Sequence, residues 1–480
     1  MATPRVTILG GSLAGLSMGL LLARRAIPST ILERDASPMG PDAAGAGAAP
    51  RRATPQARHS HAFLARARTI LRDELPGVHD AMLAAGVREA PLPYEGPGAA
   101  GTEPAATVIN ARRSVFEWAL RDAALGDPLI DVRLGEGGDG LVLTDDGAAV
   151  RGVVVDGAVV PADVVVDASG KRSPVAGWLG HEGDDSSGGD DGVDVVSCGI
   201  SYISRFYRLL DGEPTTLNRG FTHGASFDRY SCLVFPADNG TFSVTFGILP
   251  EDRALRALLD GAGFDAAASA IEGIGPWVDP AVSSPINDPN LMAGLANRFC
   301  ARPGASRPLG VLRAGDALCV TNPAHTRGTT LAMVTAQRLA DALVEHGTDT
   351  VALAGVLDAV NDEELAPWFA DSVEQDAVRL QRWRPGVEPE RPPGPAHRLG
   401  NGETYVAAAA DPVVWDAFTR LQSSLAMPAE VLDDAEIERR VRAVQATGHS
   451  LPGLAAPDHD GLVALAGGAG SRPGRRAVAV

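Results

Sequence analysis

The sequence predicts an α/β protein in which a βαβ unit opens the chain, an antiparallel sheet occupies the middle and helices form the end. Three observations support this prediction. A short apolar run breaks into a glycine-rich turn and then into an apolar helix within the first 25 residues. Apolar residues alternate with small or polar ones between Val195 and Leu249, which is typical of antiparallel strands. Helical periodicity then dominates after residue 328.

The composition bounds the class of protein. A chain of 480 residues with 45% hydrophobic residues can form one two-lobed unit or two domains, so a single small binding module is excluded. The formal net charge of −18 argues against a nucleic-acid partner, because phosphate binding needs a basic face. No stretch approaches membrane-spanning length, and the apolar run Leu13–Ala23 lacks the flanks of a signal peptide, so we expect a cytoplasmic protein.

The cysteines are expected to be free thiols in a reducing compartment. They lie far apart and show neither CxxC nor Cys/His ligand spacing, so no structural metal is expected. The four are Cys198, Cys232, Cys300 and Cys319.

The first βαβ unit carries a nucleotide-binding signature. Strands are expected at Arg5–Leu9 and Ser29–Leu32, with a helix at Ala14–Arg25 between them. Glycines in the turn Gly10–Gly15 let the backbone approach a diphosphate, whose charge the free amides and dipole of the helix start stabilise. Glu33 follows the second strand at the spacing of a ribose carboxylate. Ser12 occupies the second glycine position, and the motif does not distinguish one dinucleotide from another.

The middle of the chain is expected to alternate loops, helices and strands. Loops are predicted for the Gly/Ala/Pro-rich stretch Met39–Pro50, which should be mobile, and for the acidic stretch His181–Asp194. Helices are predicted for Ala62–Leu75 and Ser114–Ala124, and strands for Gly140–Val155 and Val159–Val166. Asp238-Asn239-Gly240 supplies a hairpin turn within the antiparallel sheet.

The last third is expected to return to the first domain and then become helical. Gly310–Cys319 is predicted as a strand with Gly315-Asp316 at its exit, and Thr329–Glu345 as a helix. Residues 351–385 and 403–447 are predicted to be helical, with the proline-rich linker Arg384–Pro395 between them. Gly467–Val480 is predicted to be a disordered tail.

Two further motifs follow buried strands. The strand Val164–Asp167 is followed by the small-residue turn Ala168-Ser169-Gly170, which would let backbone pack against a dinucleotide. An ordinary strand end without a ligand would show the same pattern. The second motif is Gly315-Asp316, followed by Asn322–Thr330 and a helix. A Gly-Asp pair is common by itself. It supports a dinucleotide site here because it follows the glycine-rich turn and the Asp167–Gly170 turn in the sequence.

Together these motifs resemble the FAD-dependent monooxygenases of the aromatic-hydroxylase (glutathione-reductase-type) superfamily. Within it, the similarity is closest to the bacterial branch of polyether epoxidases and related natural-product oxygenases. The segments that carry this narrower resemblance are Thr54–His61, Asp167–Gly170, Tyr202–Arg208, Leu233–Thr245 and Asn322-Pro323. One departure stands out, because those relatives usually carry Gly-x-Gly where this chain has Thr326-Arg327-Gly328.

The resemblance implies a Rossmann-type FAD-binding domain, an interleaved antiparallel-sheet substrate domain and C-terminal helices. The expected domains are 1–85, 105–180 and 296–350 for FAD, 86–104 and 181–295 for substrate, and 351–480 for the helical region with its tail. Glu33 is implied at the adenosine ribose, Arg113 near the cofactor and Asp316 at the ribityl chain. The full set of implied FAD contacts is Gly10, Ser12, Leu13, Ala14, Gly15, Glu33, Arg34, Arg58, His59, Arg113, Asp167, Gly170, Gly315, Asp316, Gly328 and Thr329.

The implied activity is hydroxylation or epoxidation of a small to medium-sized organic substrate, a natural product, through a flavin C4a-hydroperoxide formed with molecular oxygen. NAD(P)H is the expected electron donor. No second glycine-rich βαβ unit is present, so the donor would bind transiently or act through a separate flavin reductase. The substrate pocket is expected on the second lobe, lined by candidates of which half should be plain core: Tyr202, Phe221, Tyr230, Phe235 and Phe246.

The chemistry is flavin-centred, so catalytic side chains are few; His61 and Arg327 are the candidates. His59 and His61 would share one face of a strand beside the flavin, or be histidines hydrogen-bonded to backbone; a metal role is disfavoured because no further ligands cluster with them. Arg51, Arg52 and Arg58 would pair with the pyrophosphate or with the phosphate of NADPH, or form a solvated basic patch.

Three alternatives stay open. A flavin-dependent halogenase is close, although the tryptophans do not form the Trp-x-Trp-x-Ile-Pro pattern of that family and Lys171 lies in the turn after Gly170. A flavin-dependent reductase would saturate an isoprenoid double bond without oxygen uptake. A non-oxidative flavin-binding protein would have kept only the fold, which Thr326-Arg327 leaves open.

Overall fold

The computed structural model describes residues 3–49, 54–99, 103–179, 193–215, 217–300, 308–384, 386 and 397–468. The predicted basic residues Arg51 and Arg52 lie outside these ranges, as do nearly all of the acidic loop, the proline-rich linker and the tail. Within them, no helix combines the length and the apolar character that crossing a membrane requires.

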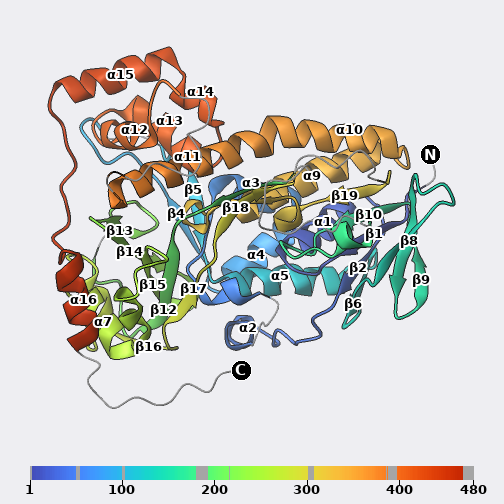
Figure 1. Cartoon of the computed structure of the whole chain (residues 1–480), viewed down its shortest axis with the longest axis horizontal. Helices are drawn as coiled ribbons and strands as arrows, with labels where there is room; N and C mark the ends of the chain where they lie inside the picture. Colours follow the sequence, from blue (N-terminus) through green and yellow to red (C-terminus); the bar gives the residue numbers. More distant parts are fainter. Residues whose placement is uncertain are drawn as a thin grey trace.

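A five-stranded parallel sheet forms the centre of the first lobe (Figure 1). From one edge to the other, the strand order is β19-β10-β1-β2-β6, and every neighbouring pair is parallel. Apolar runs buried on both faces favour such a sheet. The strands are β1 (Val6–Leu9), β2 (Ser29–Glu33), β6 (Ile130–Leu134), β10 (Val164–Asp167) and β19 (Val311–Arg313).

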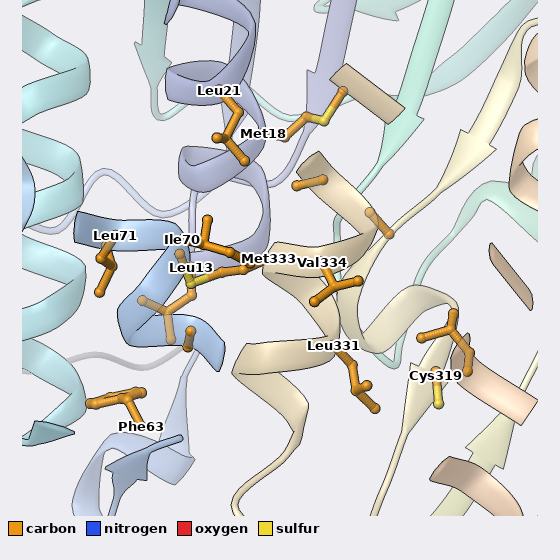
Figure 2. Close-up of a cluster of buried hydrophobic side chains, with 14 of the residues drawn as sticks. Leu13, Met18, Leu21, Phe63, Ile70, Leu71, Cys319, Leu331, Met333 and Val334 are labelled. Atoms are coloured by element: carbon orange, nitrogen blue, oxygen red, sulfur yellow. The ribbon is translucent and has the colours of Figure 1, made fainter. Parts of the chain in front are cut away.

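Helices and a small sheet enclose this parallel sheet. Three helices share one hydrophobic core with the parallel sheet and with α3 (Ala65–Glu74): α1 (Leu13–Arg24), α5 (Arg113–Gly126) and α9 (Gly328–His346). In Figure 2, side chains of α1, α3 and α9 are directed into a common cluster that includes Leu13, Ile70 and Met333. A second core joins the parallel sheet to the antiparallel strands β7 (Gly140–Leu143), β8 (Val150–Val155) and β9 (Ala158–Pro161).

The second lobe is an antiparallel sheet in the order β13-β14-β15-β12-β16, with β17 also paired to β12. Asp238-Asn239-Gly240 forms the predicted turn between β14 and β15, with Asn239 at φ 52°. One face carries a core that the helices α7 (Gly261–Ser269) and α8 (Gly275–Val278) cover. The strands are β12 (Ser201–Leu209), β13 (His223–Ser226), β14 (Tyr230–Pro236), β15 (Thr241–Ile248), β16 (Ser283–Pro285) and β17 (Asn290–Met292).

The C-terminal helices do not form a separate core. α10 (Thr350–Val360), which packs along α9 (Figure 1), continues through a π-helical turn at Asn361–Leu365 into α11 (Ala366–Trp383), which packs against β18. The helices that follow contribute to the core of the first lobe: α12 (Asn401–Ala408), α13 (Pro412–Gln422), α14 (Pro428–Leu432) and α15 (Ala435–Ala446). A last helix that the sequence did not predict, α16 (His459–Gly468), returns to pack on α7 in the second lobe.

Three predicted elements differ from the structure. Met39–Pro50 is not a mobile loop, because Ala43–Ala48 form helix α2, which Asp42 caps. The small residues of α2 let it pack against α5, and Ala46 is fully buried there. Ala62–Leu75 is not one helix, because Ala62–Phe63 (β3) pair with Thr107–Asn110 (β5) before α3 begins. Gly310–Cys319 is not one strand, because Gly315, at φ +61°, begins a tight turn.

The remaining strands form two small three-stranded sheets. One has the order β3-β5-β4, in which β4 (Arg88–Pro91) pairs with β5, and the other consists of β11 (Asp194–Ser197), β18 (Ala296–Phe299) and β20 (Cys319–Val320). The architecture is thus α/β, with a parallel sheet in one lobe and an antiparallel sheet in the other. The predicted domain boundaries stay predictions.

Candidate dinucleotide site

Three turns meet at the carboxyl ends of β1, β10 and β19, the edge at which open α/β sheets bind ligands. A Cβ atom on Gly10 would lie 2.5 Å from the oxygen of Ala168. A Cβ atom on Gly315 would lie 2.7 Å from the Cβ of Ala14. The structure therefore brings together the three sequence motifs that were predicted to form one site.

The first turn is built for close backbone approach. Gly10 has φ +101°, and a Cβ on Gly15 would lie 1.8 Å from the oxygen of Gly10, so both positions need glycine. The N-cap Ser12 makes no side-chain cap hydrogen bond, and the first intrahelical bond runs from the Leu16 amide to the Ser12 carbonyl. The amides of the first turn, at residues 13–15, therefore precede the hydrogen-bond ladder of α1 and are suited to an anion.

Glu33 lies at the end of β2 and is 8% exposed. One carboxylate oxygen accepts the Gly11 amide at 2.7 Å and the other accepts the Asp35 amide at 2.7 Å. A carboxylate offers about four lone-pair sites, so this arrangement leaves acceptor capacity for hydroxyl groups. Arg34, next along the chain, is exposed.

Arg113 and Asp316 face the same region from different elements. Arg113 opens α5, donates to Ser12 Oγ at 3.1 Å and lies 3.8 Å from the carboxylate of Glu117. Its buried Nε has no acceptor among the described residues. Desolvation raises the pKa of Asp316 above its usual range, while the charges of Arg113 and Lys171 oppose that shift. A buried donor and a poorly hydrated carboxyl thus stand beside the start of α1.

Asp167 has a different role from the predicted one. Its carboxylate is fully buried and accepts hydrogen bonds from Ser169 Oγ and Ser173 Oγ, each at 2.6 Å. We therefore reassign this side chain to holding its own turn, because both of its oxygens accept hydrogen bonds within that turn. At Gly170, φ is +89° and a Cβ would meet no atom within 4 Å, so the backbone there is open.

The His59–His61 segment crosses from the first lobe to the antiparallel sheet. His59 Nδ1 lies 2.9 Å from Ser204 Oγ of β12, and Ser60 Oγ lies 2.6 Å from Thr245 Oγ1 of β15. His61 Nδ1 lies 2.9 Å from the His59 carbonyl oxygen. His59 is therefore bonded to the second-lobe sheet and His61 to the backbone of its own segment, and the two do not share one strand face. Arg58, just before them, is exposed.

Both imidazoles are held neutral at physiological pH. Burial lowers the pKa of His59 to about 4, and the neighbouring charge of Arg58 acts in the same direction. Burial also lowers the pKa of His61 to about 3, with a further contribution from the charge of Arg113. Neither group is therefore a proton donor near pH 7.

The predicted pocket residues divide between the two faces of the second-lobe sheet. Tyr230 and Phe246 belong to the core beneath α7 and are fully buried, so their prediction as pocket residues was wrong. The alternation of strand side chains puts Tyr202 and Phe235 on the opposite face, where Phe235 is half-buried. Phe221 packs outside both, against a small cluster that includes Leu92.

Hydroxyl groups on that opposite face were not foreseen. Ser204, Ser243 and Thr245 join Ser60 through hydrogen bonds of 2.6–2.7 Å. Their sequence signal is the polar half of the alternation in β12 and β15.

Arg327 is not available for catalysis. Its side chain is 1% exposed, pairs with the fully buried Asp371 and lies 4.4 Å from the ring centre of Trp368 on α11. The physical reason is charge compensation, since a guanidinium turned away from solvent needs a carboxylate partner. Gly328 and Thr329 do begin α9 as predicted, and a Cβ on Gly328 would meet no atom within 4 Å.

Comparison with known proteins agrees with this geometry at the level of the fold. No family model matches the sequence. Protein Rv3254 of Mycobacterium tuberculosis (strain ATCC 25618 / H37Rv) is 28% identical over 461 residues, covering 87% of this chain and 89% of that protein.

Solved structures match over most of the chain. The flavin-dependent brominase Bmp2 has a TM-score of 0.61 at 16% identity and covers 93% of this chain and 99% of its own. PqsL, a probable FAD-dependent monooxygenase from Pseudomonas aeruginosa, has a TM-score of 0.56 at 16% identity, over 79% and 98%. OxyS anhydrotetracycline hydroxylase from Streptomyces rimosus has a TM-score of 0.55 at 18% identity, over 88% and 76%. The chain has the fold of flavin-dependent monooxygenases and halogenases.

Proposed function

We propose that this protein binds FAD at the meeting point of the three turns and is an FAD-dependent monooxygenase. The observation that carries the proposal is the contact of Gly10 with Ala168 and of Gly315 with Ala14, which makes one continuous edge from three motifs that are far apart in sequence. The shared fold with FAD-dependent monooxygenases supports it.

The residues present fit the cofactor. The unpaired amides at the start of α1 suit the diphosphate, and Glu33 retains acceptor capacity for the adenosine ribose. Asp316, whose charged form is destabilised by burial, would gain from hydrogen bonds donated by ribityl hydroxyls. Arg113, whose Nε makes no hydrogen bond to the described residues, would add a charge-assisted contact at the diphosphate. Arg58, His59 and Gly170 remain predicted contacts at the same edge.

FAD when bound would supply the activated oxygen, and the protein would supply position and a dry environment. The open backbone at Gly328, at the start of α9, allows a flat ring to approach the first turn of that helix, whose dipole favours negative charge. Neutral His59 and His61 would leave the region without a mobile proton donor at pH 7.

The proposed reaction is hydroxylation or epoxidation of a small to medium-sized organic substrate, with NAD(P)H as donor directly or through a separate reductase. The face of the second-lobe sheet opposite the α7 core combines half-buried Phe235 and Leu233 with hydroxyls such as Ser243. That mixture suits a largely apolar molecule with a few polar groups.

Halogenation is the second candidate, because Bmp2 and CmlS, a flavin-dependent halogenase with a TM-score of 0.56 at 19% identity, share the fold. Stopped-flow spectroscopy separates the two. The protein with FAD is reduced by NADPH or dithionite and mixed with oxygenated buffer, with and without bromide. A monooxygenase shows flavin reoxidation that is unaffected by bromide, and a halogenase gives halide-dependent product. A flavin that never reduces contradicts both.

A further inference from the structure

The loop Asn322–Arg327, which leads into α9, is attached to α11 at two points. Fully buried Asn322 donates from Nδ2 to Asp376 at 2.5 Å, and Arg327 pairs with Asp371. The two attachment points are five residues apart on the loop, and their partners Asp371 and Asp376 are five residues apart on the helix. Helix α11 therefore fixes both ends of the loop.

The second lobe contributes to the same junction. Tyr202 of β12 donates its hydroxyl to Asn322 Oδ1 at 2.7 Å. Thr326 adopts φ 55° and ψ 18°, a left-handed conformation that glycine takes more readily. A threonine persists in this conformation when the surrounding structure fixes it, which the attachments at both ends of the loop do.

The pair between Arg327 and Asp371 is shielded from solvent. Its side chains are 1% and 0% exposed. Asp371 also accepts hydrogen bonds from Gln375 Nε2 at 2.6 Å and from Asn401 Nδ2 at 3.1 Å. Charges in such surroundings are weakly screened, so removing one of them changes the local potential more than removing a surface charge does.

We infer that Arg327 and Asp371 are positioning residues that set the charge at the start of α9 and thereby the reduction potential of the bound flavin. The inference rests on the proposed function, in which the first turn of α9 lies against the flavin ring. Reduction adds two electrons and one proton to that ring and leaves it with a negative charge near neutral pH. An uncompensated Arg327 favours this state, and an uncompensated Asp371 opposes it.

Three charge-removal variants test the inference: Asp371→Asn, Arg327→Gln and the double variant. Each is saturated with FAD at pH 7.5 and reduced by xanthine and xanthine oxidase against a dye of known potential. Asp371→Asn is expected to shift the reduction equilibrium about tenfold towards the reduced flavin, because arginine stays charged. Arg327→Gln is expected to shift it in the opposite direction, and the double variant to stay within about threefold of wild type.

A control ion pair is removed by Asp265→Asn in the second lobe. Asp265 lies on α7, which is in the other lobe from α9 (Figure 1), and pairs with Arg205 at 2.8 Å, so its loss is expected to leave the equilibrium unchanged. The FAD dissociation constant of each variant, measured by fluorescence, separates weaker binding from an altered potential.

Shifts in the same direction for both single variants, or no shift while FAD stays bound, would overturn the inference, because a purely structural pair has no sign dependence. If Asp371→Asn does not fold, comparing Arg327→Gln with the double variant still tests the sign. A wild-type chain that takes up no FAD contradicts the proposed function, and the inference falls with it.

Discussion

Gly10 lies directly against Ala168: a Cβ atom added to Gly10 would stand 2.5 Å from the Ala168 backbone oxygen. This contact joins the turn after β1 to the turn after β10. It holds because β1 and β10 pair in parallel, Leu9 opposite Asp167, so that both chains leave the sheet at the same edge. The predictions below follow from this edge and from the faces of the second-lobe sheet.

Gly10→Ala is expected to lower FAD affinity at least tenfold and to destabilise the fold by roughly 2 kcal/mol or more. The new methyl group would meet backbone atoms, and φ +101° strains any residue with a side chain. Gly77→Ala in α4 (Pro76–Ala84) is the matched control, since a Cβ there meets nothing within 4 Å. Thermal unfolding and FAD titration should show the control unchanged or slightly more stable. Equal effects at the two positions would contradict the packing argument.

Asp316→Asn is expected to weaken FAD binding by about 1.5–3 kcal/mol, a loss of roughly 10- to 150-fold, because a charged acceptor for ribityl hydroxyls is removed. The exposed Asp146→Asn, in the turn between β7 and β8, is the control. Isothermal titration with FAD measures both. Unchanged affinity in Asp316→Asn would remove this residue from the site.

The buried histidine His59 is expected to make stability depend on pH. Its pKa is lowered from 6.5 to about 4 on folding, so the folded protein binds fewer protons than the unfolded chain between these values. The stability that comes from burying His59 in its neutral form is therefore fully present above pH 6.5. As the pH falls from 6.5 to 5, the free energy of unfolding is expected to decrease by on the order of 1.5 kcal/mol. Urea unfolding across this range should show a shallower dependence in His59→Gln than in wild type. Parallel curves would contradict the assignment.

The two faces of the second-lobe sheet predict opposite consequences for two phenylalanines. Phe246 is fully buried in the core beneath α7, so Phe246→Ala is expected to cost about 3–5 kcal/mol of unfolding free energy. Phe235 is half-buried on the other face, so Phe235→Ala should cost roughly 1–2 kcal/mol. Its effect should appear instead in substrate-stimulated NADPH oxidation. A larger loss of stability in Phe235→Ala would mean that the faces are reversed.

The local motifs were predictable because each is a short pattern with its own physical cause. The buried strands, the glycine turn, Glu33 and the start of α9 all lie where the sequence placed them. The alternation in β14 and β15 also identified a sheet, although it could not say which face meets the first lobe. That choice depends on where α7 and α16 pack, which periodicity alone does not encode.

The parts that the sequence missed depend on which partner each charged side chain meets in the folded chain. Arg327 looked like a site residue until its partner Asp371 was placed beside it, 44 residues away. Asp167 likewise looked available until Ser169 and Ser173 were seen to use its oxygens. In both cases the residue type was informative, but its partner decided its role.

The measurement that bears most directly on the whole account is the FAD content of the purified wild-type protein. The account predicts a yellow protein, or one that becomes yellow on reconstitution, with one FAD per chain and with weaker retention in Gly10→Ala and Asp316→Asn. A folded, colourless protein that takes up no FAD at any concentration would contradict it.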